Sequence, residues 1–301
     1  MKKADIKTSF SCNNNCLFCV QDDKRYRYDD KSTKEVKSEL KDAVENHEMV
    51  VFTGGEITIR KDLPELVRYA REIGFKRVQL QTNGRRFAYK KYCKSLIEAG
   101  ANEFGLALHG ATAEIHDYLT QVEGSFSQTT KGIENLTSMG QRVIMNSVLT
   151  KPGYNSFPAL ADLFIDLGVD QYQFAFMHIN KSIQNDSEKI KKIVPKKSEV
   201  MPYVKEGLQK GIDAGITVMT EAIPFCFMDG FENYIAECGK IPEGAVYDAE
   251  LKLDNYESYR KTVGKKKAKK CKKCKYFNIC EGPWKEYPEI FGWEEFQPIK
   301  K

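Results

Sequence analysis

The sequence contains no apolar stretch long enough to cross a membrane and no secretory signal at its start. No run of 18 apolar residues occurs in the 301 residues, whereas a membrane-spanning helix needs about 20. The first residues also lack the charged region and the apolar region that together define a signal peptide. These absences argue against a membrane protein or a secreted protein. They predict a cytoplasmic protein, in which nine cysteines favour metal ligation over disulfides.

The composition is that of a globular protein with an uneven distribution of charge. Hydrophobic residues make up 41% of the chain and charged residues 30%. A chain of this length accommodates one α/β barrel, with or without a small appendage. The net charge is +5. Much of the positive charge lies in a lysine run made of Lys265, Lys266, Lys267, Lys269, Lys270, Lys272, Lys273 and Lys275.

Residues 1–180 alternate between segments typical of strands and amphipathic segments typical of helices. The predicted strands are residues 6–10, 49–53, 77–81, 103–108, 142–149 and 171–178. The helices predicted between them include residues 33–45, 63–73, 92–99, 129–139 and 157–167. Six such units with right-handed crossovers predict a partial (β/α)6 parallel barrel. In such a barrel, chemistry gathers at the C-terminal ends of the strands.

The pattern changes after the sixth predicted strand. We expect residues 179–197 to form an exposed connection, followed by a helix at 198–214 and a strand at 217–222. Beyond Pro224 the segments become short and carry Gly, Pro and Cys. The sequence therefore predicts a barrel domain over residues 1–222 and a small Cys-rich domain over residues 223–301.

Three cysteines near the start of the chain, Cys12, Cys16 and Cys19, are spaced C-x3-C-x2-C. A 4Fe–4S cluster that a protein closes takes one thiolate per iron, so three thiolates would leave one iron open, as catalytic metal sites do. The asparagines at 13–15 favour turns that let the loop wrap around a cluster, and Phe18 places an aromatic side chain beside it. The alternatives are a zinc site completed by a distant ligand, or three unrelated thiols.

This loop resembles the cluster loop of the radical SAM superfamily, and the resemblance covers most of residues 1–220. It implies that S-adenosylmethionine (SAM) binds the open iron through its amino and carboxylate groups. It further implies that an electron from the 4Fe–4S cluster cleaves SAM to give a 5′-deoxyadenosyl radical, and that Phe18 helps to position SAM.

Residues at the ends of later predicted strands resemble SAM-binding positions of that superfamily. Gly54, Gly55 and Glu56 end the second strand, where paired glycines let backbone groups approach a ligand closely. The resemblance implies that this motif holds the methionine amino group of SAM. It also implies a contact from Asn146, on the fifth strand, to the ribose or carboxylate of SAM. His109 ends the fourth strand and has two interpretations, a contact to cofactor or substrate and a structural histidine.

Two further groups of residues have a strong structural interpretation. The segment 81–84 ends in Asn83-Gly84, which resembles a superfamily motif but is also a common turn dipeptide. We expect His116 and Asp117 to act first in capping and packing.

A second group of cysteines lies in the predicted Cys-rich domain. Cys271, Cys274 and Cys280 are spaced C-x2-C-x5-C, and Cys226 and Cys238 lie upstream. Four thiolates would close a cluster, which would then carry electrons or hold structure. We choose Cys226, Cys271, Cys274 and Cys280 as the ligands, with Cys238 as the alternate. A structural zinc site is the alternative, because zinc suits tetrahedral thiolate sites equally well.

The second group resembles the auxiliary-cluster domain called Twitch, a shortened relative of the SPASM domain. The resemblance implies a second, auxiliary 4Fe–4S cluster. SPASM domains continue with a further cysteine where this chain has Trp284. We therefore expect one auxiliary cluster and not two.

The resemblance implies a radical SAM enzyme, of an oxidoreductase or bond-forming type, that removes hydrogen from a substrate in the barrel mouth. We favour a peptide or protein substrate, as for a maturase. The alternative is a small-molecule or cofactor-biosynthesis oxidoreductase. Only 11 residues precede Cys12, so we expect a leader-binding domain to be a separate protein or absent.

The simplest interpretation of the lysine run is a solvated surface without a specific function. The functional alternatives are a contact for an acidic peptide, for an acidic electron donor such as flavodoxin or ferredoxin, or for nucleic acid. No aromatic residue interrupts the run before Tyr276, which disfavours a stacking platform for single-stranded nucleic acid. A different class, a non-catalytic iron–sulfur or zinc protein that binds RNA, is opposed by the paired SAM-site motifs.

Overall fold

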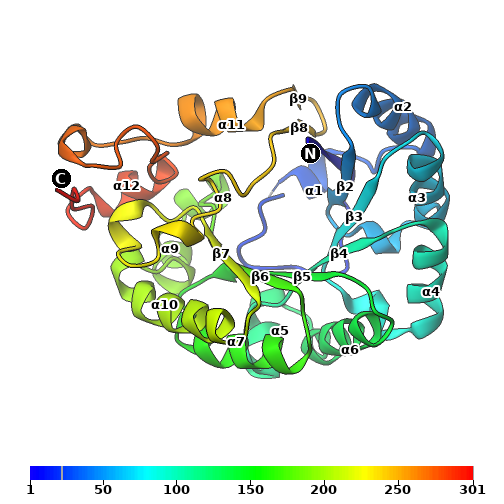
Figure 1. Ribbon diagram of the computed structural model, residues 1–301, viewed down its shortest axis with the longest axis horizontal. Helices are drawn as coiled ribbons and strands as arrows, with labels where there is room; N and C mark the ends of the chain where they lie inside the picture. Colours follow the sequence, from blue (N-terminus) through cyan, green and yellow to red (C-terminus); the bar gives the residue numbers. More distant parts are fainter. Residues whose placement is uncertain (22, 301) are drawn as a thin grey trace.

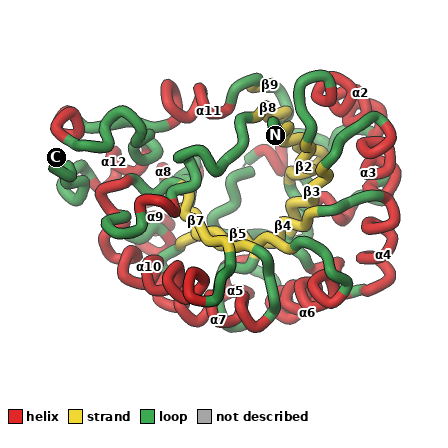
Figure 2. The backbone as a smooth tube through the Cα atoms, viewed as in Figure 1, coloured by secondary structure: helices red, strands yellow, loops and turns green. Residues whose placement is uncertain are grey.

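The computed structural model describes residues 1–21 and 23–300. Within these residues, nine strands form one sheet in the order β7-β6-β5-β4-β3-β2-β1-β8-β9. Neighbouring strands are parallel except for the last pair, β8 and β9. The sheet curves with its helices on the outer side, as Figure 1 and Figure 2 show, which confirms the expected partial parallel barrel.

The strands and helices of the first 180 residues follow the predicted ranges, with ends that differ by a few residues. The strands are β1 (Lys3–Ser9), β2 (Met49–Gly54), β3 (Arg77–Thr82), β4 (Glu103–Ala107), β5 (Val143–Leu149), β6 (Gln171–Phe176), β7 (Thr217–Glu221), β8 (Gly244–Tyr247) and β9 (Lys252–Leu253). The helices are α1 (Lys24–Arg27), α2 (Thr33–Val44), α3 (Leu63–Glu72), α4 (Lys90–Ala99), α5 (Ala113–Thr120), α6 (Ser125–Ser138), α7 (Phe157–Asp166), α8 (Lys181–Gln184), α9 (Ser187–Ile193), α10 (Lys197–Asp213), α11 (Tyr256–Tyr259) and α12 (Glu286–Phe291).

Local sequence sets the ends of several helices. At the start of α2, the Ser32 side chain accepts from the Glu35 N–H at 3.3 Å, and the Glu35 carboxylate accepts from the Ser32 N–H at 2.7 Å. Pro64 and Pro158 lie in the first turns of α3 and α7, where no backbone N–H is needed. Helix α4 ends at Gly100 in the left-handed conformation. These signals depend only on near neighbours, which is why the helix positions were predictable.

The alternation along each strand separates the core from the barrel interior. On β5 and β6, Val143, Met145 and Tyr172 are buried and belong to the hydrophobic core. The residues between them point to the opposite face of the sheet. There Asn146 and Gln173 are partly exposed and polar. Because the helices cover the outer face, these polar side chains face the barrel interior.

The segment between β6 and α10 is not the exposed connection that we expected. It contains α8 and α9, and Ile179, Ile183 and Ile193 are buried. The expectation was wrong because the lysines of this segment dominate its composition, whereas its few isoleucines pack on the core.

Lys197, which ends that segment, is also buried, with 1% exposure. Its Nζ donates to the Ala222 carbonyl at 3.0 Å and lies 3.1 Å from the centre of the Phe176 ring and 4.7 Å from that of Tyr287. Burial lowers the pKa of Lys197 well below its usual range. The side chain therefore links α10 to the chain that follows β7.

Residues after 222 contribute to the same sheet as the barrel. Strand β8 pairs in parallel with β1, with Gly244 opposite Lys3 and Tyr247 opposite Ile6. The segment then passes through β9 and α11 to α12, at the far left of Figure 1. The division of the chain at residue 222 stays a prediction. In the described ranges no helix has both the length and the apolar character that crossing a membrane requires.

Candidate cluster and cofactor sites

Cys12, Cys16 and Cys19 lie in the loop after β1, at the C-terminal edge of the barrel, and each is partly exposed. Burial, with smaller contributions from Cys19 and Cys12, raises the pKa of the Cys16 thiol to about 12. Burial also raises the pKa of Cys12, to about 11. Because the pKa values of Cys12 and Cys16 are raised, these two neighbouring thiols need a positively charged partner to become thiolates together. An iron–sulfur cluster fits this requirement.

Two arginines hold the backbone of the cluster loop, by which we mean residues 10–21. Arg25 Nη2 donates to the Asn14 carbonyl at 2.8 Å. Arg85 Nη1 donates to the Asn13 carbonyl at 2.6 Å and to Asn14 Oδ1 at 2.8 Å. Neither arginine was a predicted site residue. Arg85 directly follows the Asn83-Gly84 turn, so that motif was the signal available for it.

The two glycines of the Gly-Gly-Glu motif bring the end of β2 against the end of β1 and the start of the cluster loop. A Cβ atom on Gly54 would lie 2.2 Å from the Ser9 carbonyl oxygen, and one on Gly55 would lie 2.2 Å from that of Ser11. Gly54 also has a φ of +142°, which side chains disfavour. The Gly55 N–H donates to the Ser9 carbonyl at 2.7 Å. The close approach that these glycines permit is to the protein backbone, and their contact with SAM stays a prediction.

Glu56 is fully buried and joins the ends of β2 and β3. Its Oε1 accepts hydrogen bonds from the hydroxyls of Thr58 and Thr82, each at 2.6 Å. Its Oε2 accepts from the Asn83 N–H at 2.7 Å. The carboxylate therefore orders the strand ends beside the cluster loop, and its contact with the amino group of SAM stays a prediction.

Phe18 packs against a buried pair of histidines. Its ring meets the His109 ring edge-on, with centres 4.7 Å apart. The His109 N–H donates to His116 Nδ1 at 3.1 Å, and His109 Nδ1 accepts from the Val148 N–H at 3.2 Å. Burial lowers the pKa of both histidines, that of His116 to about 4. These bonds give His109 a structural role behind Phe18.

The capping role expected of Asp117 is confirmed. Its carboxylate accepts from the N–H groups of Gly124 and Phe126, each at 2.7 Å, at the start of α6.

Asn146 belongs to a row of polar side chains on three adjacent strands. Gln173 Nε2 lies 3.3 Å from Asn146 Oδ1 and 3.2 Å from Glu221 Oε2. Burial raises the pKa of Glu221. Glu221 ends β7, so a carboxyl group with a raised pKa lies at the barrel edge where chemistry is expected. Sequence analysis missed this residue, because a single glutamate at a strand end carries no pattern.

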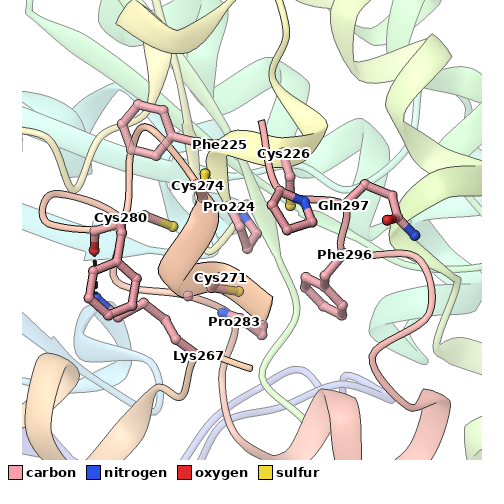
Figure 3. Close-up of a pocket in the computed structure, with 13 residues that line it drawn as sticks. Pro224, Phe225, Cys226, Lys267, Cys271, Cys274, Cys280, Pro283, Phe296 and Gln297 are labelled. Atoms are coloured by element: carbon pink, nitrogen blue, oxygen red, sulfur yellow. Dashed lines mark hydrogen bonds between the residues drawn. The ribbon is translucent and has the colours of Figure 1, made fainter. Parts of the chain in front are cut away.

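The four cysteines chosen for the auxiliary cluster line one pocket. Figure 3 shows Cys226, Cys271, Cys274 and Cys280 around it. The pocket has ≈ 390 Å³ of space free of protein atoms, part of which is open solvent. Burial, followed by the thiols of Cys280 and Cys271, raises the pKa of Cys226 to about 12. Cys226 is 45 residues before Cys271, so folding has gathered a set of thiols suited to a thiophilic metal cluster.

Cys238, the alternate ligand, lies outside that set. It is exposed and lines a smaller neighbouring pocket with Cys280 and Glu237. Among the described residues, no three His, Cys, Asp or Glu side chains lie close enough together to hold a single metal ion. The assignment of ligands to either cysteine group therefore stays a prediction.

The lysine run does not form one uniform surface, because Lys265 turns inward. Its Nζ lies 2.7 Å from Glu237 Oε1 and 2.8 Å from Glu281 Oε2. Glu281 also pairs with Arg260 through two hydrogen bonds of 3.0 Å. The side chains of Lys265 and Glu281 are 2% and 3% exposed. The interpretation of the whole run as a solvated surface is therefore wrong at Lys265, whose ammonium group forms ion pairs with two buried carboxylates.

Trp284 joins the Cys-rich segment to the end of a barrel strand. It is buried, and its ring centre lies 4.1 Å from that of His178, just after β6. Burial, with Lys265 as the next cause, lowers the pKa of His178 to about 4. Trp284 therefore packs the Cys-rich segment onto the barrel.

Residues 6–155 match the sequence model of the Radical SAM superfamily. With the parallel barrel and the three-cysteine loop at its edge, the chain belongs to the radical SAM superfamily. The cofactors of this superfamily are a 4Fe–4S cluster and SAM.

The curated relatives that match this chain are named as different enzymes. The chain is 33% identical to Fe-coproporphyrin III synthase of Methanosarcina barkeri over 154 residues, which cover 50% of the chain and 38% of that protein. Matches to the first curated relatives span 38% to 53% of their length.

Two solved structures share the fold over nearly the whole chain. The SuiB protein of Streptococcus suis, bound to the precursor peptide SuiA, is 18% identical with a TM-score of 0.65, covering 95% of this chain and 72% of that one. The native anSMEcpe structure with bound AdoMet is also 18% identical, with a TM-score of 0.67, and covers 100% and 93%.

Proposed function

We propose that this protein is a radical SAM enzyme that modifies a peptide or protein and carries an auxiliary 4Fe–4S cluster besides the one that binds SAM. The observation that carries the proposal is the pocket lined by Cys226, Cys271, Cys274 and Cys280, beyond a barrel that has its own three-cysteine loop. SuiB, which has the same fold and was solved with a precursor peptide, supports the peptide as substrate class.

In this proposal Cys12, Cys16 and Cys19 hold the catalytic cluster and leave one iron for SAM. When bound, the cluster and SAM supply a 5′-deoxyadenosyl radical that takes a hydrogen atom from the substrate. The protein positions the reactants and excludes competing reactions. Arg25 and Arg85 hold the cluster loop in place through its carbonyl groups.

The residues predicted to contact SAM have different roles in the structure. Gly54 and Gly55 let the turn after β2 lie against the cluster loop. Glu56 orders that turn, and Phe18 closes the loop over His109. Asn146 faces the barrel interior beside Gln173, where it is available to SAM or substrate.

A second candidate is a small-molecule or cofactor-biosynthesis oxidoreductase. It is favoured by the 33% identity to Fe-coproporphyrin III synthase over half of the chain. That match covers 50% of this chain and 38% of that protein, so it bears less on the substrate than the auxiliary cysteines do.

Deuterium transfer tests the proposed substrate class. The anaerobically reconstituted enzyme is incubated with SAM and either deuterated candidate peptides or deuterated iron-coproporphyrin III. We expect deuterium in 5′-deoxyadenosine only with a peptide, and a Cys16→Ala variant with the same peptide should give none. Deuterium transfer from the porphyrin alone would favour the second candidate, a small-molecule or cofactor-biosynthesis oxidoreductase, over a peptide-modifying enzyme. Undiminished SAM cleavage by Cys16→Ala would overturn both.

A further inference from the structure

Six exposed lysines lie in the segment that carries two cysteines of the auxiliary-cysteine pocket. We call them the lysine collar: Lys266, Lys267, Lys269, Lys272, Lys273 and Lys275. Lys266 lies 3.7 Å from the Glu289 carboxylate. For the other five, no ion pair with a carboxylate occurs within residues 1–21 and 23–300. The collar is therefore a cluster of largely uncompensated positive charge.

The collar and the predicted cluster ligands belong to the same short segment. The 3-10 turn Lys269–Lys273 carries Cys271 within it and Cys274 directly after it. Lys267 lines the pocket itself and donates to the Phe277 carbonyl at 2.8 Å. Because consecutive Cα atoms are only about 3.8 Å apart, a partner bound to these lysines comes to rest close to the cysteine pocket.

We propose that the lysine collar is the docking surface for an acidic electron-carrier protein, of the flavodoxin or ferredoxin class, that exchanges electrons with the auxiliary cluster. This inference rests on the proposed function, because it needs that cluster. A cluster closed by four thiolates has no open iron for substrate, which leaves electron exchange or a structural role, and the exposed positive charge beside it favours electron exchange. The reduced carrier gives up one electron and the cluster gains it, and no bond is made or broken.

Charge is what selects the partner. Uncompensated lysines attract an acidic surface, raise the rate of encounter and orient it, and they do so less as salt increases. The two lysines on β1 are different, because each is already paired with a carboxylate. Lys3 lies 3.0 Å from Asp5, and Lys7 lies 2.6 Å from Asp248. A paired lysine of this kind is less available to an acidic carrier than the collar lysines are.

The test compares two triple variants of the holoenzyme. Lys269, Lys272 and Lys273 become glutamine in the collar variant. The matched control replaces Lys90, Lys91 and Lys94, which are equally exposed on α4, on the opposite side of the molecule in Figure 1. Binding of an acidic flavodoxin is measured by anaerobic calorimetry. Reduction of the iron–sulfur absorbance by reduced flavodoxin is followed by stopped flow.

We expect the collar variant to bind flavodoxin about tenfold more weakly and to be reduced correspondingly more slowly, while the α4 variant behaves as wild type. Wild-type affinity should fall as ionic strength rises. A third variant, with arginine at the same three collar positions, keeps the charge and should bind as wild type. It separates a charge effect from a folding defect.

Equal flavodoxin binding by the collar and α4 variants would overturn the docking surface. So would a collar variant that loses affinity for peptide or RNA but not for flavodoxin. Iron content and SAM cleavage with dithionite, measured on the same samples, report on the proposed function separately. Protein with two clusters but equal flavodoxin binding refutes only the docking surface, whereas protein with one cluster refutes the auxiliary cluster and the docking surface together.

Discussion

The Lys265 ammonium lies 2.8 Å from the Glu281 carboxylate, and both side chains are almost completely buried. Glu281 is 16 residues away in sequence and also binds Arg260. Burial opposes ionisation of Glu281, but Arg260 and Lys265 together outweigh it and lower its pKa. Lys265 also binds Glu237, which accepts from the Ala222 N–H just after β7, and Glu281 directly follows Cys280 of the pocket, so the network connects the barrel to the auxiliary-cysteine segment.

Lys265→Met should destabilise the protein strongly. The change leaves Glu237 without its cation and Glu281 with Arg260 alone, and breaking a buried ion pair costs about 3–5 kcal/mol. The free energy of unfolding is measured by chemical denaturation of the wild type and of Lys266→Met, whose lysine is 57% exposed. The control should change stability by no more than about 0.5 kcal/mol. Similar losses in both variants would contradict the role of Lys265.

Asp248 should contribute stability that is lost in acid. Its carboxylate lies 2.6 Å from Lys7 and 2.5 Å from Lys24. Burial works against the ionised form, but the two lysines outweigh it and lower the pKa of Asp248 to about 2. Because the pKa is lower in the folded state, the contribution is present above about pH 4, the unfolded value. It disappears as the pH falls toward 2.

Asp248→Asn should lower the free energy of unfolding at pH 7 by about 1–2 kcal/mol, and the difference from wild type should shrink as the pH falls from 4 to 2. Asp254→Asn, at an 81% exposed carboxylate, is the matched control. A difference between wild type and Asp248→Asn that does not depend on pH would disprove the assignment.

Gly55→Ala should disrupt the cluster loop selectively. The new methyl group would lie 2.2 Å from the Ser11 carbonyl oxygen, so the loop must move and its three cysteines with it. We expect reconstituted protein to hold about half of the wild-type iron, because the auxiliary cysteines are remote from this contact. Iron analysis and Mössbauer spectra measure the loss. Full occupancy with normal SAM binding would show that the backbone contact is not needed.

Replacing a cysteine of either predicted cluster should remove about half of the bound iron, whereas replacing Cys238 should remove none. Wild type should bind about eight irons per chain, and Cys16→Ala and Cys274→Ala about four each. Cys238→Ala should keep all of them, because Cys238 lies outside the four-cysteine pocket. If Cys238→Ala lost iron and Cys226→Ala did not, Cys238 and not Cys226 would be a ligand of the auxiliary cluster. Zinc in place of iron would refute the auxiliary cluster.

Much of the barrel was predictable, because the information for it is local. Alternation placed β5 and β6, and capping or turn residues such as Ser32 and Gly100 set helix ends. Strand β8 was not predicted, since four residues carry too short a pattern and its pairing partner, β1, lies more than 200 residues away.

The sequence by itself determined that the chain carries a three-cysteine loop at the end of a barrel strand, and a second cysteine group later. Spacing within a few residues is enough for that. Only the tertiary structure decided which thiols share a pocket and which way each lysine of one run faces. Asn180 shows the reason, since it binds the Cys19 carbonyl across 161 residues. Cys226 likewise joins Cys271 only after folding, and Lys265 is buried only because Glu237 and Glu281 meet it there.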